Sequence, residues 1–298
     1  MEHNNESEAL ISDKDIQELN DIRTKLEQIL MTKLRNAGIY FHSMSRVKTL
    51  SSLQRKLDTG KYGAGKEDKK IQDLIGIRIN LFYTEDIRIC EYLLEDTFMI
   101  DNWSKTAWEE NRFEAQKCNG VFRIPSKYLV NISDSLWEQP FDKTFEVQLR
   151  TVLFEGWHEI EHEMRYKGSA FGTGNEALAR KMNSILATFE LCDDSIAGLL
   201  EDLGHQHYKD KKWNDMLRCH YRLKFENEPL HPYIEELFDS DTELAKIFYK
   251  APRQGAIEQL WLDTSENGIE LTLNNIVKIV NQTVSYTHLR AHETPEHL

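Results

Sequence analysis

The chain has 298 residues, enough for one large domain or two modest ones, and a formal net charge of −13 at pH 7. This acidic balance argues against a broad basic surface for nucleic acid, and no apolar run approaches the roughly 20 residues of a membrane-spanning helix. The four cysteines form no C-x-x-C pair and the N-terminus is polar rather than a signal peptide, so we expect a cytoplasmic protein with reduced thiols.

The first hundred residues are expected to alternate between helices and strands. Residues 1–12 are polar and predicted to be disordered. An apolar stripe at helical spacing predicts a helix over 15–34. Ser43 or Ser45 is expected to cap a second helix that runs to about Leu57, and the glycines and lysines of 58–70 predict a loop. A strand over 74–83 and a helix over 84–95 follow.

Residues 98–167 are expected to complete a sheet. Weaker strand patterns cover 98–107 and 120–124. Alternation of apolar and polar residues predicts a strand from Phe145 to Arg150, which leads into a helix that ends near Lys167. We therefore predict an α/β (α+β) fold with a mixed sheet flanked by helices over residues 13–168.

The composition changes after Gly168. A glycine-containing hinge, a long helix over 175–203 and further helical segments predict a helical C-terminal region over 169–282, either an accessory domain or an extension packed on the first domain. Residues 283–298 have no periodicity and carry several histidines, so we expect a non-native or disordered tail.

Two carboxylates are candidates for a metal site. Asp73 comes just before one predicted strand, and Glu146 lies on the polar face of another together with Gln148 and Arg150. If the two strands are neighbours, the carboxylates converge, and oxygen ligands of this kind suit Mg²⁺. The alternative is that Asp73 only begins a strand and that Glu146 is solvated.

Basic residues near these carboxylates suit a phosphate ligand. Lys48, Ser52 and Lys56 recur at i+4 on one face of the second predicted helix. Arg78 shares a strand face with Gly76, opposite the apolar residues of the same strand. Taken alone, the helix pattern is more typical of an ordinary solvated basic face.

The order and spacing of several motifs resemble those of the RelA/SpoT family of alarmone synthetases over roughly residues 15–168. The motifs are S-R-V-K-T-L-S-S-L-Q-R-K-L from Ser45, Q-D-L-I-G-I-R-I from Gln72, E-V-Q-L-R-T from Glu146, W-x-x-I-E-H from Trp157 and the pair Tyr166-Lys167. The resemblance implies a synthetase domain of nucleotidyltransferase-like fold. It also implies transfer of pyrophosphate from ATP to the 3′-hydroxyl of GDP or GTP, giving (p)ppGpp, the alarmone of the stringent response.

The resemblance also implies roles for individual residues. Asp73 would be the Mg²⁺ ligand and Glu146 a second ligand or the base for the acceptor hydroxyl. Arg78 would stack on adenine. The residues that would grip ATP are Arg46, Lys48, Ser52 and Lys56. ATP and the guanosine nucleotide are the expected partners, and a homo-oligomer is an open possibility.

The acceptor motif departs from the family pattern Asn-Gly-Tyr-x-Ser-x-His. Lys117, Asn119 and Gly120 fit it, but Val121 stands where the stacking Tyr belongs. We hypothesise that Phe122 turns toward the site through an irregularity after Gly120 and stacks on guanine. On the acceptor side the resemblance also places Gln148 and His162. A pyrophosphokinase toxin acting on an adenine nucleotide or a tRNA 3′ end is the alternative.

Two further functions are possible from the residues. His158-Glu159-Ile160-Glu161-His162 satisfies the H-E-x-x-H pattern of zinc metalloproteases, although Glu161 places a charge at an x position. A regulatory module that binds a nucleotide without turning it over is the other alternative.

Overall fold

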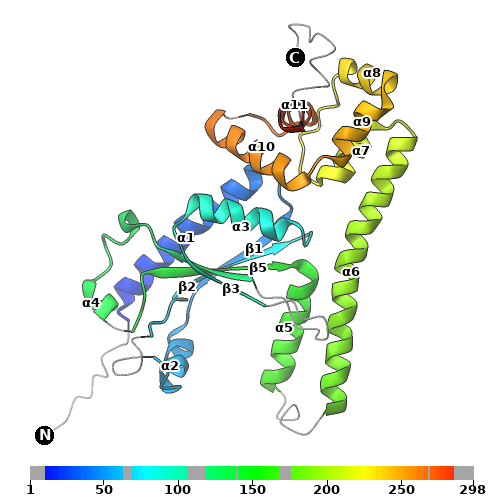
Figure 1. Cartoon of the computed structure of the whole chain (residues 1–298). Helices are drawn as coiled ribbons and strands as arrows, with labels where there is room; N and C mark the ends of the chain where they lie inside the picture. Colours follow the sequence, from blue (N-terminus) through cyan, green and yellow to red (C-terminus); the bar gives the residue numbers. More distant parts are fainter. Residues whose placement is uncertain are drawn as a thin grey trace, which may run out of the picture.

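The computed structural model describes residues 11–62, 69–106, 118–138, 140–167, 176–267 and 269–284 (Figure 1). The strands are β1 (Phe41–Val47), β2 (Ile75–Leu81), β3 (Ile100–Lys105), β4 (Cys118–Arg123) and β5 (Thr144–Thr151). The helices around them are α1 (Asp13–Asn36), α2 (Leu50–Asp58), α3 (Asp86–Thr97), α4 (Asp134–Glu138) and α5 (Val152–Lys167). The C-terminal helices are α6 (Glu176–Lys209), α7 (Trp213–Tyr221), α8 (Pro232–Ser240), α9 (Thr242–Lys250), α10 (Arg253–Asn267) and α11 (Leu273–Val284).

The strands form one mixed sheet in the order β1-β2-β5-β4-β3. β2 and β5 run parallel, and the pairs β1–β2, β5–β4 and β4–β3 are antiparallel. The predicted mixed sheet flanked by helices is therefore confirmed. Because β2 and β5 are neighbours, the strands that follow Asp73 and carry Glu146 lie side by side.

One face of the sheet forms the hydrophobic core, and α1 and α3 cover it (Figure 1). Ile77, Ile79 and Val147 point to this face and are at most 1% exposed. The apolar stripe predicted for the first helix packs here, with Leu19 and Leu26 fully buried. The opposite face carries the polar side chains of β2 and β5 and is approached by α5.

The second helix is predicted to start after a cap at Ser43 or Ser45, but the chain is a strand as far as Val47, so that prediction is wrong for the residues between the cap and Val47. In β1 the exposed and partly buried side chains alternate, and the strand pairs along the whole of β2. The long-range hydrogen bonds to β2 outweigh the local helical pattern. The helix begins only at Leu50, after Thr49, whose hydroxyl caps its first turn by accepting from Ser52 N–H.

The folded chain also begins earlier than predicted. Ile11 is 2% exposed, and the Ser12 side chain caps α1 by accepting from Asp15 N–H. These two residues belong to the fold, which contradicts the prediction of disorder through residue 12. Residues 1–10 and the predicted tail 285–298 lie outside the described residues.

The C-terminal helices share their core with the sheet region. α10 packs on α1 and α3, and Trp261 is 1% exposed with its indole N–H donating to Asp96 at 3.2 Å. The Lys33 ammonium lies 4.1 Å from the centre of the Trp261 ring. The long helix α6 runs beside α5 (Figure 1), and Thr151 at the end of β5 donates to Asp193 of α6 at 2.7 Å. This region is thus an extension packed on the first. No helix of the described part is long and apolar enough to cross a membrane.

Candidate active site

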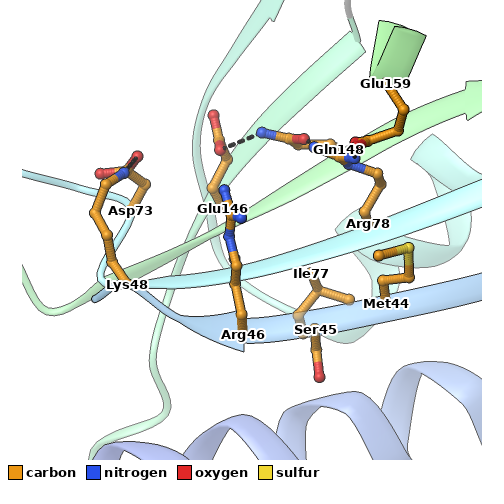
Figure 2. Close-up of a pocket in the computed structure, with 11 residues that line it drawn as sticks. Met44, Ser45, Arg46, Lys48, Asp73, Ile77, Arg78, Glu146, Gln148 and Glu159 are labelled. Atoms are coloured by element: carbon orange, nitrogen blue, oxygen red, sulfur yellow. Dashed lines mark hydrogen bonds and ion pairs between the residues drawn. The ribbon is translucent and has the colours of Figure 1, made fainter. Parts of the chain in front are cut away.

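Two rows of side chains cross the polar face of the sheet and bring the predicted residues together. Arg46 of β1 is opposite Gly76 of β2, which is opposite Glu146 of β5. One step along the strands, Arg78 is opposite Gln148. Residues that are paired across strands project to the same face of a sheet. The pairing therefore collects four predicted site residues from three strands on one surface, as Figure 2 shows.

A cavity of about 240 Å³ opens over these rows. Its lining includes Arg46, Lys48, Asp73, Gly76, Arg78, Glu146, Gln148 and Glu159. A Cβ added at Gly76 would meet no atom within 4 Å. The glycine thus leaves open the space between the side chains of Arg46 and Glu146, and a larger residue there would project into the cavity.

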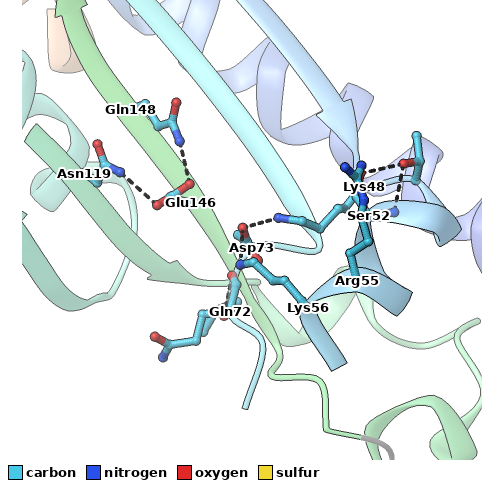
Figure 3. Close-up of polar contacts among 11 residues, drawn as sticks. Lys48, Ser52, Arg55, Lys56, Gln72, Asp73, Asn119, Glu146 and Gln148 are labelled. Atoms are coloured by element: carbon cyan, nitrogen blue, oxygen red, sulfur yellow. Dashed lines mark hydrogen bonds and ion pairs between the residues drawn. The ribbon is translucent and has the colours of Figure 1, made fainter. Parts of the chain in front are cut away.

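Asp73 lies at the edge of the cavity, held by two lysines (Figure 3). Its carboxylate accepts a hydrogen bond from the Lys48 ammonium, and Lys56 donates to both of its oxygens at 2.8 Å. Burial acts to raise the pKa of Asp73, but the hydrogen bonds and charges of the two lysines outweigh it, so the pKa lies below its ordinary value. Burial lowers the pKa of Lys48, and Asp73 offsets only part of this effect. The carboxylate is therefore ionised at neutral pH.

The basic residues come from two elements rather than from one helix. Arg46 is the penultimate residue of β1, and Lys48 follows the strand, where its N–H donates to the Leu74 carbonyl at 2.8 Å. Ser52 and Lys56 lie on α2. Lys56 reaches the cavity rim through Asp73, whereas the Ser52 hydroxyl accepts from Arg55 at 3.2 Å on an exposed part of the helix.

Glu146 is oriented by two amides. Its two oxygens accept hydrogen bonds from Asn119 at 3.0 Å and from Gln148 at 2.7 Å (Figure 3). Asn119 of β4 is opposite Gln148 in the sheet register, so both amides come from the same row. The arrangement fixes the position of the carboxylate beside the cavity.

Arg78 is bound by three side chains, and no motif in the sequence connected it with the two acidic ones. Its guanidinium donates to Gln148 at 3.1 Å, to Glu159 at 2.7 Å and to Glu155. Glu155 also accepts from Arg150 at 3.2 Å. The signal in the sequence was a pair of acids at i and i+4 on the helix that directly follows β5.

The hypothesis that Phe122 turns toward the site is wrong. In the register with β5, Phe122 is opposite Phe145 on the core face, whereas Val121 is opposite Glu146 on the site face. Phe122 is fully buried, and its ring lies 5.5 Å from Trp103 and 5.7 Å from Phe145 between ring centres. The β4–β5 register continues without a shift through Gly120. The irregularity of this part of the sheet lies instead between β3 and β4.

Two predicted acceptor residues cannot be placed in the site. Lys117 lies outside the described residues, and of His162 the structure describes only its position in α5 and not its side chain. Asn119 and Gln148 are brought to the cavity through Glu146.

The environment of His158 does not favour the zinc-protease hypothesis. Ligand atoms of Glu155, His158 and Glu159 lie within 4.8 Å of one another. Both glutamates, however, are already paired with Arg78. Burial lowers the pKa of His158, and the positive charges of Arg150 and Arg78 lower it further. The same two guanidinium groups would repel a cation at this position.

Residues 45–170 match the family model described as the region found in RelA / SpoT proteins. The resemblance inferred from the motifs is confirmed over these residues. No curated protein sequence matches the chain.

Similar solved structures include small alarmone synthetase 1 from Bacillus subtilis, with 22% identity and a TM-score of 0.46 over 61% of this chain and 90% of that one. The same protein bound to its product pppGpp has 21% identity and a TM-score of 0.48 over 61% and 91%. A GTP pyrophosphokinase family protein from Streptococcus pneumoniae has 17% identity and a TM-score of 0.47 over 64% and 91%.

Proposed function

We propose that the chain transfers pyrophosphate from ATP to the 3′-hydroxyl of GDP or GTP, producing AMP and ppGpp or pppGpp. The observation that carries the proposal is the set of side chains around one cavity within the RelA/SpoT region. Asp73 and Glu146, which bear carboxylates, and the basic residues Arg46, Lys48 and Arg78 come together there from separate parts of the chain. Pyrophosphate transfer needs these two kinds of group, because catalysis depends on positioning and on neutralising charge.

The basic residues are the proposed ATP site. A triphosphate is a stronger competitor for Lys48 and Lys56 than the single charge of Asp73, so the lysines would move from the carboxylate to the phosphates. Arg46 and Arg78 lie in adjacent rows with the open space of Gly76 beside them. The planar guanidinium groups suit stacking on adenine.

The donor set of the cavity fits Mg²⁺. Asp73 is ionised, Glu146 lies on the neighbouring strand, and Mg²⁺ is commonly held by one or two carboxylates together with substrate phosphates. Asp73 would hold the ion with the phosphates. When bound, the ion would neutralise the charge that develops on the transferring group.

Glu146 is the proposed base. Its oxygens are oriented by Asn119 and Gln148 and keep lone pairs for a further hydrogen bond. The 3′-oxygen of the acceptor would attack the β-phosphorus of ATP while its proton passes to Glu146. The bond from the β-phosphorus to the oxygen of the α-phosphate breaks, and AMP leaves with that oxygen.

The test is incubation of the purified chain with Mg²⁺ and ATP labelled at the β-phosphate, with GDP, GTP, AMP and tRNA as separate acceptors. We expect label in a guanosine product with GDP and GTP, and AMP formed in equal amount. Transfer only to AMP or to the tRNA end would refute the guanosine acceptor and support the toxin-like reaction. Absence of transfer to any acceptor would refute the proposed chemistry.

A further inference from the structure

A second cavity lies where the C-terminal helices meet the sheet region. Its volume is about 470 Å³, within the range of roughly 300–1,000 Å³ of small-molecule sites. One wall is the turn after β2 and the start of α3, and the others come from α6, α7, α9 and α10. The cavity is built from both regions of the chain and is separate from the candidate active site, with which it shares no lining residue.

Three arginines line this cavity in a chain of net charge −13. Arg222 is paired with Glu85, and Arg253 is 2.6 Å from the carboxylate of Asp86. Glu201 is the other acid of the lining. The lining residues alone thus carry three positive charges and two negative ones. Arg88 is exposed, and within the described part of the chain no hydrogen bond or ion pair engages its guanidinium.

The two paired arginines keep unused hydrogen-bond donors. The side chains of Arg222 and Arg253 are 7% and 8% exposed. The Nε of Arg222 and the Nη2 of Arg253 are buried and have no hydrogen-bond partner in the described structure. Such groups are rare in folded proteins because each costs about 1–3 kcal/mol. An anion with several oxygens is a partner that suits guanidinium groups in this environment.

The backbone conformation of Arg222 is also unusual. Arg222 caps the C-terminus of α7 with φ 52° and ψ 42°, a left-handed conformation for which glycine or asparagine is usual. A non-glycine residue held in this conformation is a reason to look for a role of its side chain. The Arg222 guanidinium lies 5.5 Å from the centre of the Tyr83 ring. The ion pair of Arg222 with Glu85 links the two regions of the chain, but it does not account for the unpaired guanidinium of Arg88 in the same lining.

Flat rings complete the lining. Tyr249 and His220 both line the cavity, with ring centres 5.7 Å apart. We propose that the cavity binds a nucleoside monophosphate or diphosphate. Arg88 and Arg222 hold its phosphate, and its base lies against Tyr249, since aromatic side chains stack on any base. A ligand placed there would contact both regions of the chain.

The first experiment measures binding of labelled GMP and AMP to the full chain by equilibrium dialysis. Arg88→Ala is the informative variant because its side chain supports no described contact, and Arg35→Ala, an exposed arginine in the last turn of α1, is the matched control. We expect roughly tenfold weaker binding of at least one nucleotide in Arg88→Ala, the usual effect of losing a charge-assisted hydrogen bond, with an unchanged melting temperature without ligand. Arg35→Ala should bind as the wild type does, and Lys48→Ala should retain the binding that Arg88→Ala weakens.

The second experiment locates the ligand. Cys219 lines the cavity and is partly exposed, whereas Cys192 is exposed on α6 away from it. The bound nucleotide should slow alkylation of Cys219 by N-ethylmaleimide, followed by peptide mass spectrometry, and leave Cys192 unaffected. Arg88→Ala should lose this protection.

Several results would overturn the inference. Equal binding by Arg88→Ala and the wild type, or binding abolished by Lys48→Ala, would assign the nucleotide to the active site. Failure of both nucleotides to bind, or unchanged alkylation of Cys219, would show that the cavity is not a nucleotide site. Protection by inorganic phosphate equal to that by GMP would reduce it to a phosphate site without a nucleoside.

Discussion

Substitutions at the adjacent residues Phe122 and Val121 should have opposite kinds of effect, because the two side chains lie on opposite faces of β4. Phe122 is fully buried among Phe98, Phe145 and Trp103, so Phe122→Ala removes three ring contacts and leaves a cavity. Such a change costs about 3–5 kcal/mol. We expect a large fall in the unfolding free energy measured in urea, and an unchanged acceptor Michaelis constant in the protein that remains folded.

Val121→Tyr tests the other face. Val121 is opposite Glu146, and in the described part of the sheet no aromatic side chain lies on the site face of β3 or β4. If a guanine base lies beside this position, a tyrosine there should gain stacking worth about 1–3 kcal/mol, or roughly a tenfold to hundredfold lower Michaelis constant for GDP. Initial rates at saturating ATP measure it. The reasoning fails if Phe122→Ala keeps full stability and weakens GDP binding, or if Val121→Tyr leaves GDP kinetics unchanged.

Further predictions concern the two carboxylates of the cavity, Gly76 between Arg46 and Glu146, and the metal. Asp73→Asn or Glu146→Gln should lower turnover roughly a hundredfold or more, because each removes charge stabilisation or proton transfer. Asp58→Asn, at an exposed position of α2, is the control and should keep normal turnover. Normal turnover in both Asp73→Asn and Glu146→Gln would reject their catalytic roles. Gly76→Val should keep or raise the melting temperature, since its Cβ meets no atom within 4 Å, and should weaken ATP binding in a nucleotide-binding assay; unchanged ATP affinity would place ATP elsewhere. Activity should need Mg²⁺ or Mn²⁺ and persist after zinc chelation and in His158→Ala, and a tightly held zinc lost in that variant would contradict this. Because the pKa of Asp73 is below its ordinary 3.8, its stabilising effect is present above that pH and is lost as the pH falls through the folded value; the difference in unfolding free energy between wild type and Asp73→Asn should therefore narrow below about pH 4.

The sequence predicted best those features that depend on a single strand, such as the face to which each side chain projects. The alternation in 145–150 was enough to put Glu146 and Gln148 on one face and the apolar residues on the other. This feature depends on local periodicity, which can be read from a single sequence. The sequence left open whether the strands at Asp73 and Glu146 are neighbours, and the parallel pairing of β2 with β5 shows that they are.

Features that depend on long-range partners were not predictable in this way. The sequence of β1 does not alternate strictly, because His42 and Ser43 are both polar, as are Ser45 and Arg46, and a helix cap at one of the serines fits the same residues. This segment forms a strand because it pairs with β2, which the sequence alone does not show. The pairing of Glu155 with Arg78 likewise cannot be predicted from the sequence of α5. The two residues meet only because α5 packs on the sheet.

Because β1 is a strand and not the start of α2, Arg46 and Lys56 belong to different elements of the proposed ATP site. As a strand residue, Arg46 is held by the sheet register opposite Gly76, so its direction is fixed by backbone hydrogen bonds. Lys56 lies instead on α2, a short helix whose one buried residue is Leu53. The backbone at Arg46 is therefore held by the sheet, whereas Lys56 is carried by an element with few buried contacts, which is free to adjust at lower cost. A planar guanidinium suits the flat base of the proposed ATP ligand, and adjustable ammonium groups suit its triphosphate, whose geometry changes during transfer. In the proposed mechanism, the ion pairs of Asp73 with Lys48 and Lys56 would hold both ammonium groups at the cavity rim until the triphosphate displaces the carboxylate.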